Sequence, residues 1–138
     1  MIENNKKVIE NIYAAFNSRN YEGVLSHFTD DFEWQAADNS PLADQSPYHG
    51  IEAIREGVFA RIAAGFEKLE VEIDEIFEGD GRVVVLGYYH GKFHGNANES
   101  KTQLAHIWTV RDGKATKFQQ YIDTLAIFRS VSELSSAA

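Results

Sequence analysis

The 138-residue sequence contains no cysteine, only two prolines and a single methionine. The absence of cysteine excludes disulfide bonds, thiol catalysis and cysteine-ligated zinc. Long apolar runs are also missing, since none approaches the roughly 20 residues that span a bilayer. Residues 1–7 read as the start of a charged helix rather than as a signal peptide. We therefore expect a cytoplasmic protein without a membrane-spanning segment.

Positive charge is scarce as well. The chain has 13 Lys and Arg against 21 Asp and Glu, a formal net charge of −8. Phosphate backbones and anionic membrane surfaces are bound by basic patches, so we expect neither nucleic acid nor membrane as a partner. Apolar residues make up 43% of the chain, enough for one ordinary core. We expect a single domain over residues 1–130 and a frayed tail over residues 131–138.

Hydrophobic periodicity predicts helices in the first half and strands in the second. Ile9, Ile12, Tyr13 and Phe16 form the apolar stripe of a helix within residues 3–18. Shorter helical patterns and strand patterns follow in this order: helix 21–28, strand 31–37, helix 51–65, then strands over 69–77, 82–94, 103–111 and 114–123. A phase shift at residues 75–77 predicts a β-bulge. The order indicates an α+β fold with helices packed on one side of a curved antiparallel sheet.

The most informative segment is the last predicted hairpin, residues 103–123. Asp112-Gly113 favours a two-residue loop, because both positions tolerate positive φ. Counted outward from this loop, His106 lies opposite Gln119. One face then carries Leu104, His106, Trp108, Gln119, Tyr121 and Asp123, and the other carries Ala105, Ile107, Phe118 and Ile122. A face that mixes aromatics with His, Gln and Asp suits a small-molecule pocket, although a one-residue slip would exchange the faces.

Three residues of that face are candidates for catalysis. Asp123, enclosed by aromatic side chains, would be a general acid or base, unless it caps a helix that follows it. His106 would polarise a carbonyl or shuttle a proton; the alternative is a hydrogen-bonded histidine of the wall. The two residues lie about 13 Å apart along the sheet, so they form no dyad. Tyr121, diagonal to His106, is the nearer partner.

Aromatic residues elsewhere in the chain are the predicted lining of the pocket. The residues expected to contact a ligand are Trp34, Tyr13, Phe59, Phe93 and Trp108, together with Gln119 and with Tyr48 at the mouth. We expect no metal. His90 and His94 lie on one face of a strand, about 13 Å apart, which is too far to share an ion.

The element order and several motifs resemble the NTF2-like superfamily. Ala14-Ala15-Phe16-Asn17 and the segment Phe28–Trp34 are similar to the N-terminal pattern of that family. Pro47–Ile54 resembles the segment that opens its third helix, and residues 106–123 resemble the last hairpin of SnoaL-like and ketosteroid-isomerase-related members. The resemblance implies an NTF2-like cone, a curved antiparallel β-sheet wrapped around three N-terminal helices. It also implies a homodimer through the outer sheet face, which carries Ile107, Phe118 and Ile122 in the predicted register.

The catalytic positions of the family's enzymes can be compared with this sequence one by one, and the comparison distinguishes the activities it could support. Ketosteroid isomerases pair a general-base Asp with an oxyanion hole of Tyr and protonated Asp. The resemblance places Ala36, Ile12 and His106 at those positions, so steroid isomerisation is not expected. Asp123 matches the Asp that SnoaL-type cyclases and limonene-epoxide-hydrolase-type enzymes keep after the last strand. The epoxide hydrolases add an Arg and a second Asp, which the preceding strand lacks here.

The resemblance implies a protein with a pocket for a small apolar or carbonyl-containing ligand. If it is an enzyme, we expect a cofactor-independent acid–base isomerase, cyclase or hydratase. In that case Asp123 exchanges the proton, while His106, Tyr121 and Gln119 orient the substrate oxygen. Two alternatives stay open: a non-catalytic ligand-binding or dimeric accessory module, and an epoxide-hydrolase-like enzyme.

Overall fold

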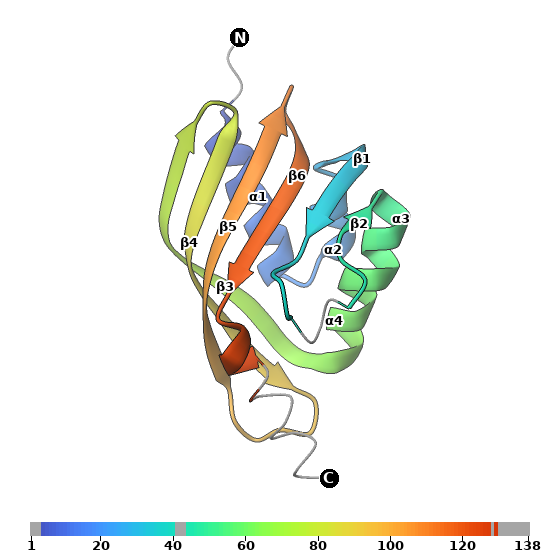
Figure 1. Cartoon of the computed structure of the whole chain (residues 1–138), viewed down its shortest axis with the longest axis vertical. Helices are drawn as coiled ribbons and strands as arrows, with labels where there is room; N and C mark the ends of the chain where they lie inside the picture. The colour runs from blue at the N-terminus through green and yellow to red at the C-terminus, as the bar shows by residue number, and fades with distance from the viewer. Residues whose placement is uncertain (1–3, 41–43, 128, 130–138) are drawn as a thin grey trace.

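The computed structural model describes residues 4–40, 44–127 and 129, and in it a curved sheet holds helices against its concave face (Figure 1). The helices are α1 (Asn5–Asn17), α2 (Tyr21–Leu25) and one longer segment made of α3 (Ile51–Ile54), the π-helical turn η1 (Arg55–Phe59) and α4 (Ala60–Gly65). The predicted NTF2-like α+β cone is confirmed. The predicted tail, residues 131–138, lies outside the described residues, as do residues 41–43, between the predicted strand 31–37 and the predicted helix 51–65.

Six strands form the sheet in the order β2-β1-β6-β5-β4-β3. Their bounds are β1 (Phe28–Gln35), β2 (Tyr48–His49), β3 (Phe66–Gly79), β4 (Arg82–Phe93), β5 (Ser100–Arg111) and β6 (Lys114–Ile122). Four of the five pairings are antiparallel, but β1 runs parallel to β6. The short strand β2 lies between the predicted strand 31–37 and the predicted helix 51–65, where no element was predicted, and it pairs with the end of β1. No helix within the described ranges is long and apolar enough to cross a membrane.

The first helix docks on the sheet through its predicted apolar stripe and through one amide. Ile9, Ile12, Tyr13 and Phe16 are all buried, which confirms the stripe. At the C-terminal end of α1, the Asn17 side chain donates to the Val71 carbonyl (3.0 Å) and accepts from the Val71 N–H (2.8 Å). Because β3 is an edge strand, these backbone groups would otherwise lack a partner. The amide therefore fixes α1 against the edge of the cone.

The last hairpin has the predicted turn but not the predicted register. Arg111 pairs with Lys114 around Asp112-Gly113, as expected. A bulge at Thr116 then shifts the pairing by one residue, so that His106 lies opposite Gln120 instead of Gln119. The predicted faces of β6 are therefore wrong, because a one-residue slip moves every side chain to the other face.

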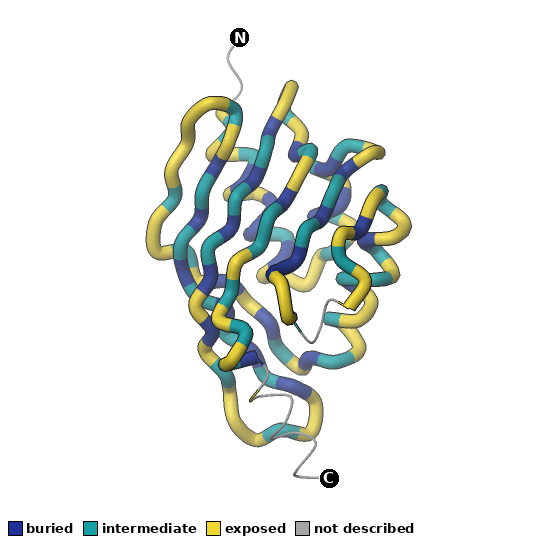
Figure 2. The backbone as a smooth tube through the Cα atoms, viewed as in Figure 1, coloured by how far each residue is buried: buried dark blue, intermediate teal, exposed yellow. Residues whose placement is uncertain are grey.

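The corrected register exchanges which residues of β6 face the core. Phe118 is almost completely buried, and Ile122 packs against the core cluster. These two residues point inward and do not form the outer face predicted for dimerisation. Alternation of buried and exposed positions along the strands is visible in Figure 2. Tyr121, predicted to face the pocket, is 55% exposed on the outer face.

The predicted bulge in the third strand is present, with its shift between Ile73 and Glu75. Gly87 on β4 pairs with Ile73 at this irregularity. A Cβ atom at Gly87 would collide with the backbone carbonyl of Glu72. The close approach of the two backbones therefore requires glycine at position 87.

Substitution of Gly87 tests this close approach. We expect Gly87→Ala to lower the free energy of unfolding by at least about 2 kcal/mol, because either backbone must move. Gly79→Ala is the matched control on β3, since a Cβ there meets no atom within 4 Å. Urea unfolding of both variants measures the difference. Equal stability of the two variants would show that the bulge does not constrain position 87.

Candidate functional site

A cavity of about 300 Å³ lies between the concave face of the sheet and the segment from η1 to α4. Its walls are mostly apolar, with Phe16, Trp34, Val58, Ile62, Leu69 and Phe93 among them. Polar side chains reach it at four described positions: Ser40, Arg61, Tyr89 and Gln120. A mostly apolar space with a few polar groups is the usual form of a small-molecule site.

A continuous chain of buried hydrogen bonds stands behind the cavity wall. Trp108 Nε1 donates to Tyr13 Oη at 2.9 Å, and Tyr13 Oη lies 2.6 Å from His106 Nδ1. On the other side of the imidazole, Nε2 lies 2.8 Å from Tyr89 Oη. Gln120 Nε2 donates to Tyr89 Oη at 2.9 Å. The chain therefore runs from the deepest part of the core to a residue that lines the cavity.

The fold brings these residues together through strand alternation and the corrected register. His106 and Trp108 are two residues apart on β5, so both point inward. The bulge at Thr116 places Gln120 directly opposite His106. Tyr13 arrives from the buried stripe of α1, and its ring stacks on the imidazole with centroids 5.9 Å apart. The network consequently joins the first helix to three adjacent strands.

Burial keeps the whole network neutral near pH 7. Desolvation lowers the pKa of His106 to about 3, because the charged imidazolium would lose its hydration without gaining an ionised partner. The same desolvation raises the pKa values of Tyr13 and Tyr89 above the ordinary value of a phenol. His106 is therefore a hydrogen-bonding group of fixed charge and not a base that titrates near neutrality.

The structure gathers most of the predicted ligand-contacting aromatics around this site. Tyr13, Trp34, Phe59 and Trp108 line a separate, smaller space, together with His106, and Trp34 also lines the 300 Å³ cavity. The smaller space has a volume of about 20 Å³, room for about one water molecule. Phe93 lines the larger cavity, as expected. Tyr48 is buried but lies over Gly57 of η1 and does not line the cavity.

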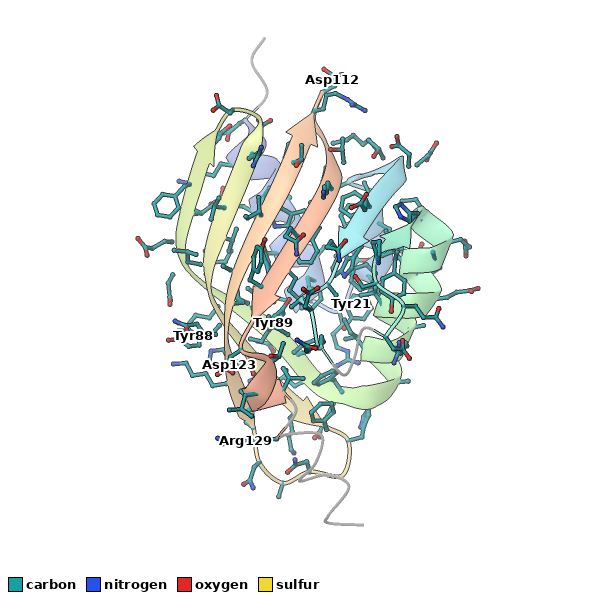
Figure 3. The ribbon with its side chains drawn as sticks, in the orientation of Figure 1. Tyr21, Tyr88, Tyr89, Asp112, Asp123 and Arg129 are labelled. Carbon is teal, nitrogen blue, oxygen red and sulfur yellow. The ribbon has the colours of Figure 1, made fainter. Side chains whose placement is uncertain are left out.

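The remaining three predicted residues lie elsewhere. Asp123 is exposed at the end of β6 (Figure 3), and its Oδ1 accepts a hydrogen bond from the Ala126 N–H at 3.2 Å. It therefore caps the helical turn at residues 124–127, and its predicted enclosure by aromatic side chains is wrong. Gln119 and Tyr121 point to the outer face because of the bulge. The prediction that these three residues share a pocket with His106 is therefore wrong.

Sequence reasoning missed Tyr89, Gln120 and Arg61. A signal for Tyr89 existed, because it is four residues from Phe93 on β4 and so shares its face. Gln120 was missed because the bulge was not foreseen. Arg61 lines the mouth of the cavity and forms an ion pair with Asp44, with 2.7 Å between Nη1 and Oδ1.

Metal ligation finds no support in the described part of the chain. No group of three or more His, Asp or Glu side chains there could hold a metal ion. His90 points to the outer face, where its Nε2 lies 2.8 Å from Glu72 Oε1. His94 is exposed beyond the end of β4.

Comparison with known proteins shows which family and which solved structures this chain resembles. A family model described as a SnoaL-like domain matches residues 9–118. An NTF2-like protein of unknown function from Burkholderia pseudomallei K96243 is similar, with 24% identity, a TM-score of 0.85, and coverage of 95% of this chain and 99% of that one. TerC, co-crystallised with polyporic acid, is 28% identical, with a TM-score of 0.81 and coverage of 93% and 98%. No curated protein matches the chain.

The buried network makes a prediction about stability. We expect Tyr13→Phe to lower the free energy of unfolding by about 2–3 kcal/mol, because Trp108 Nε1–H and His106 Nδ1 lose their partner in the core. Tyr21→Phe is the matched control, since the buried Tyr21 hydroxyl has no hydrogen-bond partner among the described residues. That variant should stay within about 0.5 kcal/mol of the parent. Urea unfolding measures both, and similar losses in the two would contradict the network.

The lowered pKa of His106 makes a prediction about pH. Between about pH 3 and 6.5 the unfolded chain binds a proton at this imidazole and the folded chain does not. Stability should therefore rise with pH across this window, by up to about 1.4 kcal/mol per pH unit from His106. Urea unfolding at pH 5.5 and 7.0, with His106→Gln for comparison, isolates its share. An NMR titration in which the His106 ring protonates near pH 6.5 would contradict the assignment.

Proposed function

This chain belongs to the SnoaL-like domain family, and from this membership we propose that it binds a small, largely apolar molecule and hydrogen-bonds an oxygen atom of that molecule. The observation that carries the proposal is the position of Tyr89. Its hydroxyl is held from behind by His106 and Gln120 while its side chain forms part of an apolar cavity wall. A fixed polar group in an apolar surrounding orients a ligand.

Size and chemistry of the cavity indicate the class of ligand. About 300 Å³ is at the lower end of the range for small-molecule pockets, which suits a molecule of about two fused aromatic rings. Aromatic side chains such as Trp34 and Phe93 offer surfaces for a flat ring system. The similarity to TerC, which was co-crystallised with polyporic acid, supports a small-molecule occupant.

Cofactor-independent catalysis is the second candidate, and the hydroxyl of Tyr89 favours it. A preorganised donor in a site shielded from water stabilises the negative charge that develops on a carbonyl oxygen during enolisation. Isomerisation, aldol-type cyclisation and hydration next to a carbonyl group can each proceed through such a step. The described residues that line the 300 Å³ cavity include no Asp, Glu or His, so the proton acceptor for this step is not among them. Binding is therefore the first proposal and catalysis the second.

A pair of isosteric probes tests the binding proposal. 2-Acetylnaphthalene and 2-isopropenylnaphthalene differ only by C=O in place of C=CH₂, so only the ketone accepts a hydrogen bond. We expect the ketone to bind about tenfold more tightly, the usual worth of one hydrogen bond. Tyr89→Phe should abolish this preference, whereas Tyr21→Phe should keep it. Quenching of tryptophan fluorescence gives the six dissociation constants, and equal affinity of the parent for both probes would refute the proposal.

Deuterium exchange separates the two candidates. An enzyme that enolises carbonyl compounds should speed the incorporation of deuterium from D₂O into the methyl group of 2-acetylnaphthalene, and Tyr89→Phe should slow it. A binding protein should leave the exchange at the rate in buffer. Proton NMR of the methyl signal follows either result.

A further inference from the structure

We infer that the hydrogen bonds behind the cavity have one fixed direction, which turns the Tyr89 hydroxyl proton into the cavity and makes Tyr89 a donor only toward a ligand. The ligand class that follows from this direction rests on the proposed function. The direction itself is a property of the free protein. It follows from counting protons along the chain of hydrogen bonds.

The series of hydrogen bonds from Trp108 to Gln120 has, at each of its two ends, a donor whose direction is unambiguous. The indole of Trp108 carries only a donor, so Tyr13 Oη accepts from it. The Ala37 N–H donates to Gln120 Oε1 at 3.2 Å, which fixes the orientation of that amide. Gln120 therefore presents its NH₂ group to Tyr89 Oη. Each tyrosine oxygen thus accepts one hydrogen bond from the end of the chain nearer to it.

The imidazole between the tyrosines allows only two arrangements. A neutral His106 has one N–H and one lone pair, so one tyrosine donates to the ring and the other accepts from it. If Nδ1 carries the proton, Tyr89 donates to Nε2, and Tyr13 accepts from both Trp108 and Nδ1. If Nε2 carries the proton, Tyr13 donates to Nδ1, and Tyr89 accepts from both Gln120 and Nε2. The tyrosine that accepts twice must send its own proton elsewhere.

Only Tyr89 lines the 300 Å³ cavity, whereas Tyr13 borders just the 20 Å³ space, whose polar lining atoms are already paired with one another and leave a water there too few partners. Tyr13 is 4% exposed, and the described residues offer its hydroxyl no partner other than His106 and Trp108. Its proton would be buried without an acceptor in the first arrangement, which is costly. Tyr89 lines the 300 Å³ cavity, where water or a ligand accepts the proton. The second arrangement, with the proton of His106 on Nε2, is therefore the stable one.

This direction defines what the site accepts. Tyr89 Oη already accepts from His106 and Gln120, so both of its lone pairs are used and a donor on the ligand finds no acceptor there. Arg61, at the mouth, carries only donors. At Tyr89 the site therefore favours ketones, quinones and other compounds with an unprotonated oxygen over alcohols and amines, whose O–H or N–H finds no acceptor on the tyrosine. Acceptor capacity among the described lining side chains remains only at the Ser40 hydroxyl and at the second lone pair of Gln120 Oε1. His106 and Gln120 are positioning residues for the donor Tyr89.

The tautomer of His106 in the free protein is the first test. Long-range ¹H–¹⁵N correlation spectra of the ¹⁵N-labelled protein at pH 7 distinguish a protonated from an unprotonated ring nitrogen. We expect Nε2 to be protonated and Nδ1 to be unprotonated. A spectrum with the proton on Nδ1, or on both nitrogens, would overturn the inference whether or not any ligand binds.

Reversal of the direction is the second test. Gln120→Glu keeps the shape of the side chain but replaces the NH₂ donor by a carboxylate oxygen, which should attract the Tyr89 proton away from the cavity. At pH 8 we expect the roughly tenfold preference for 2-acetylnaphthalene over 2-isopropenylnaphthalene to fall to less than about twofold. Tyr89→Phe should give the same loss, and Gln119→Glu, on the outer face, should keep the preference.

The two tests separate failure of the direction from failure of the proposed function. If Gln120→Glu retains the ketone preference and Tyr89→Phe loses it, Tyr89 binds the ligand but its direction is not set as inferred. If the parent binds neither probe while Nε2 of His106 is protonated, the direction holds and the proposed ligand class is wrong. An alcohol, 1-(2-naphthyl)ethanol, should bind less tightly than the ketone, and tighter binding of the alcohol would overturn the assignment of Tyr89 as a donor only.

Discussion

The pairing of one buried imidazole with two tyrosine hydroxyls is the interaction on which the rest of this structure depends. His106 is 2% exposed, so both ring nitrogens need partners within the protein. Tyr13 supplies one from α1 and Tyr89 supplies the other from β4. The first helix is thereby joined to the middle of the sheet through a polar contact, in addition to its apolar stripe. A polar group that must be satisfied at both ends specifies one position of the helix more sharply than apolar packing alone.

Burial also limits what His106 can do in chemistry. An exposed imidazole titrates near neutrality and shuttles protons, whereas the depressed pKa here, about 3, removes that ability at physiological pH. What remains is orientation: the ring fixes the hydroxyl of Tyr89, a residue whose side chain lines the cavity. Two hydrogen bonds thus offset the cost of burying the imidazole. They also fix the position and the proton of the Tyr89 hydroxyl before a ligand arrives.

Much of the fold could be predicted from the sequence, but the site depended on one residue of register. Helical stripes, the Asp112-Gly113 turn and the NTF2-like order were all readable, because each rests on a local pattern. The bulge at Thr116 contains no glycine that would indicate it in the sequence. Counting from the turn therefore assigned Gln119 and Tyr121 to the wrong face of the sheet. The hydrophobic pattern of β6 indicates the correct register, because Phe118 and Ile122 lie on the same face and both pack in the core. Where counting from a turn and the apolar pattern predict different registers, the register that buries the apolar side chains is the more stable one.

The resemblance to ketosteroid isomerases shows why this fold does not by itself give a reaction. The resemblance places His106 where those enzymes have a protonated Asp that donates directly to the substrate oxygen. A neutral imidazole at that depth is enclosed by Tyr13 and Tyr89, so it cannot reach a ligand itself. The donor that faces the cavity is displaced onto Tyr89 of the neighbouring strand. Because the side chains at all three catalytic positions of those enzymes differ here, ligand and chemistry must be argued from Tyr89 and not from the shared fold.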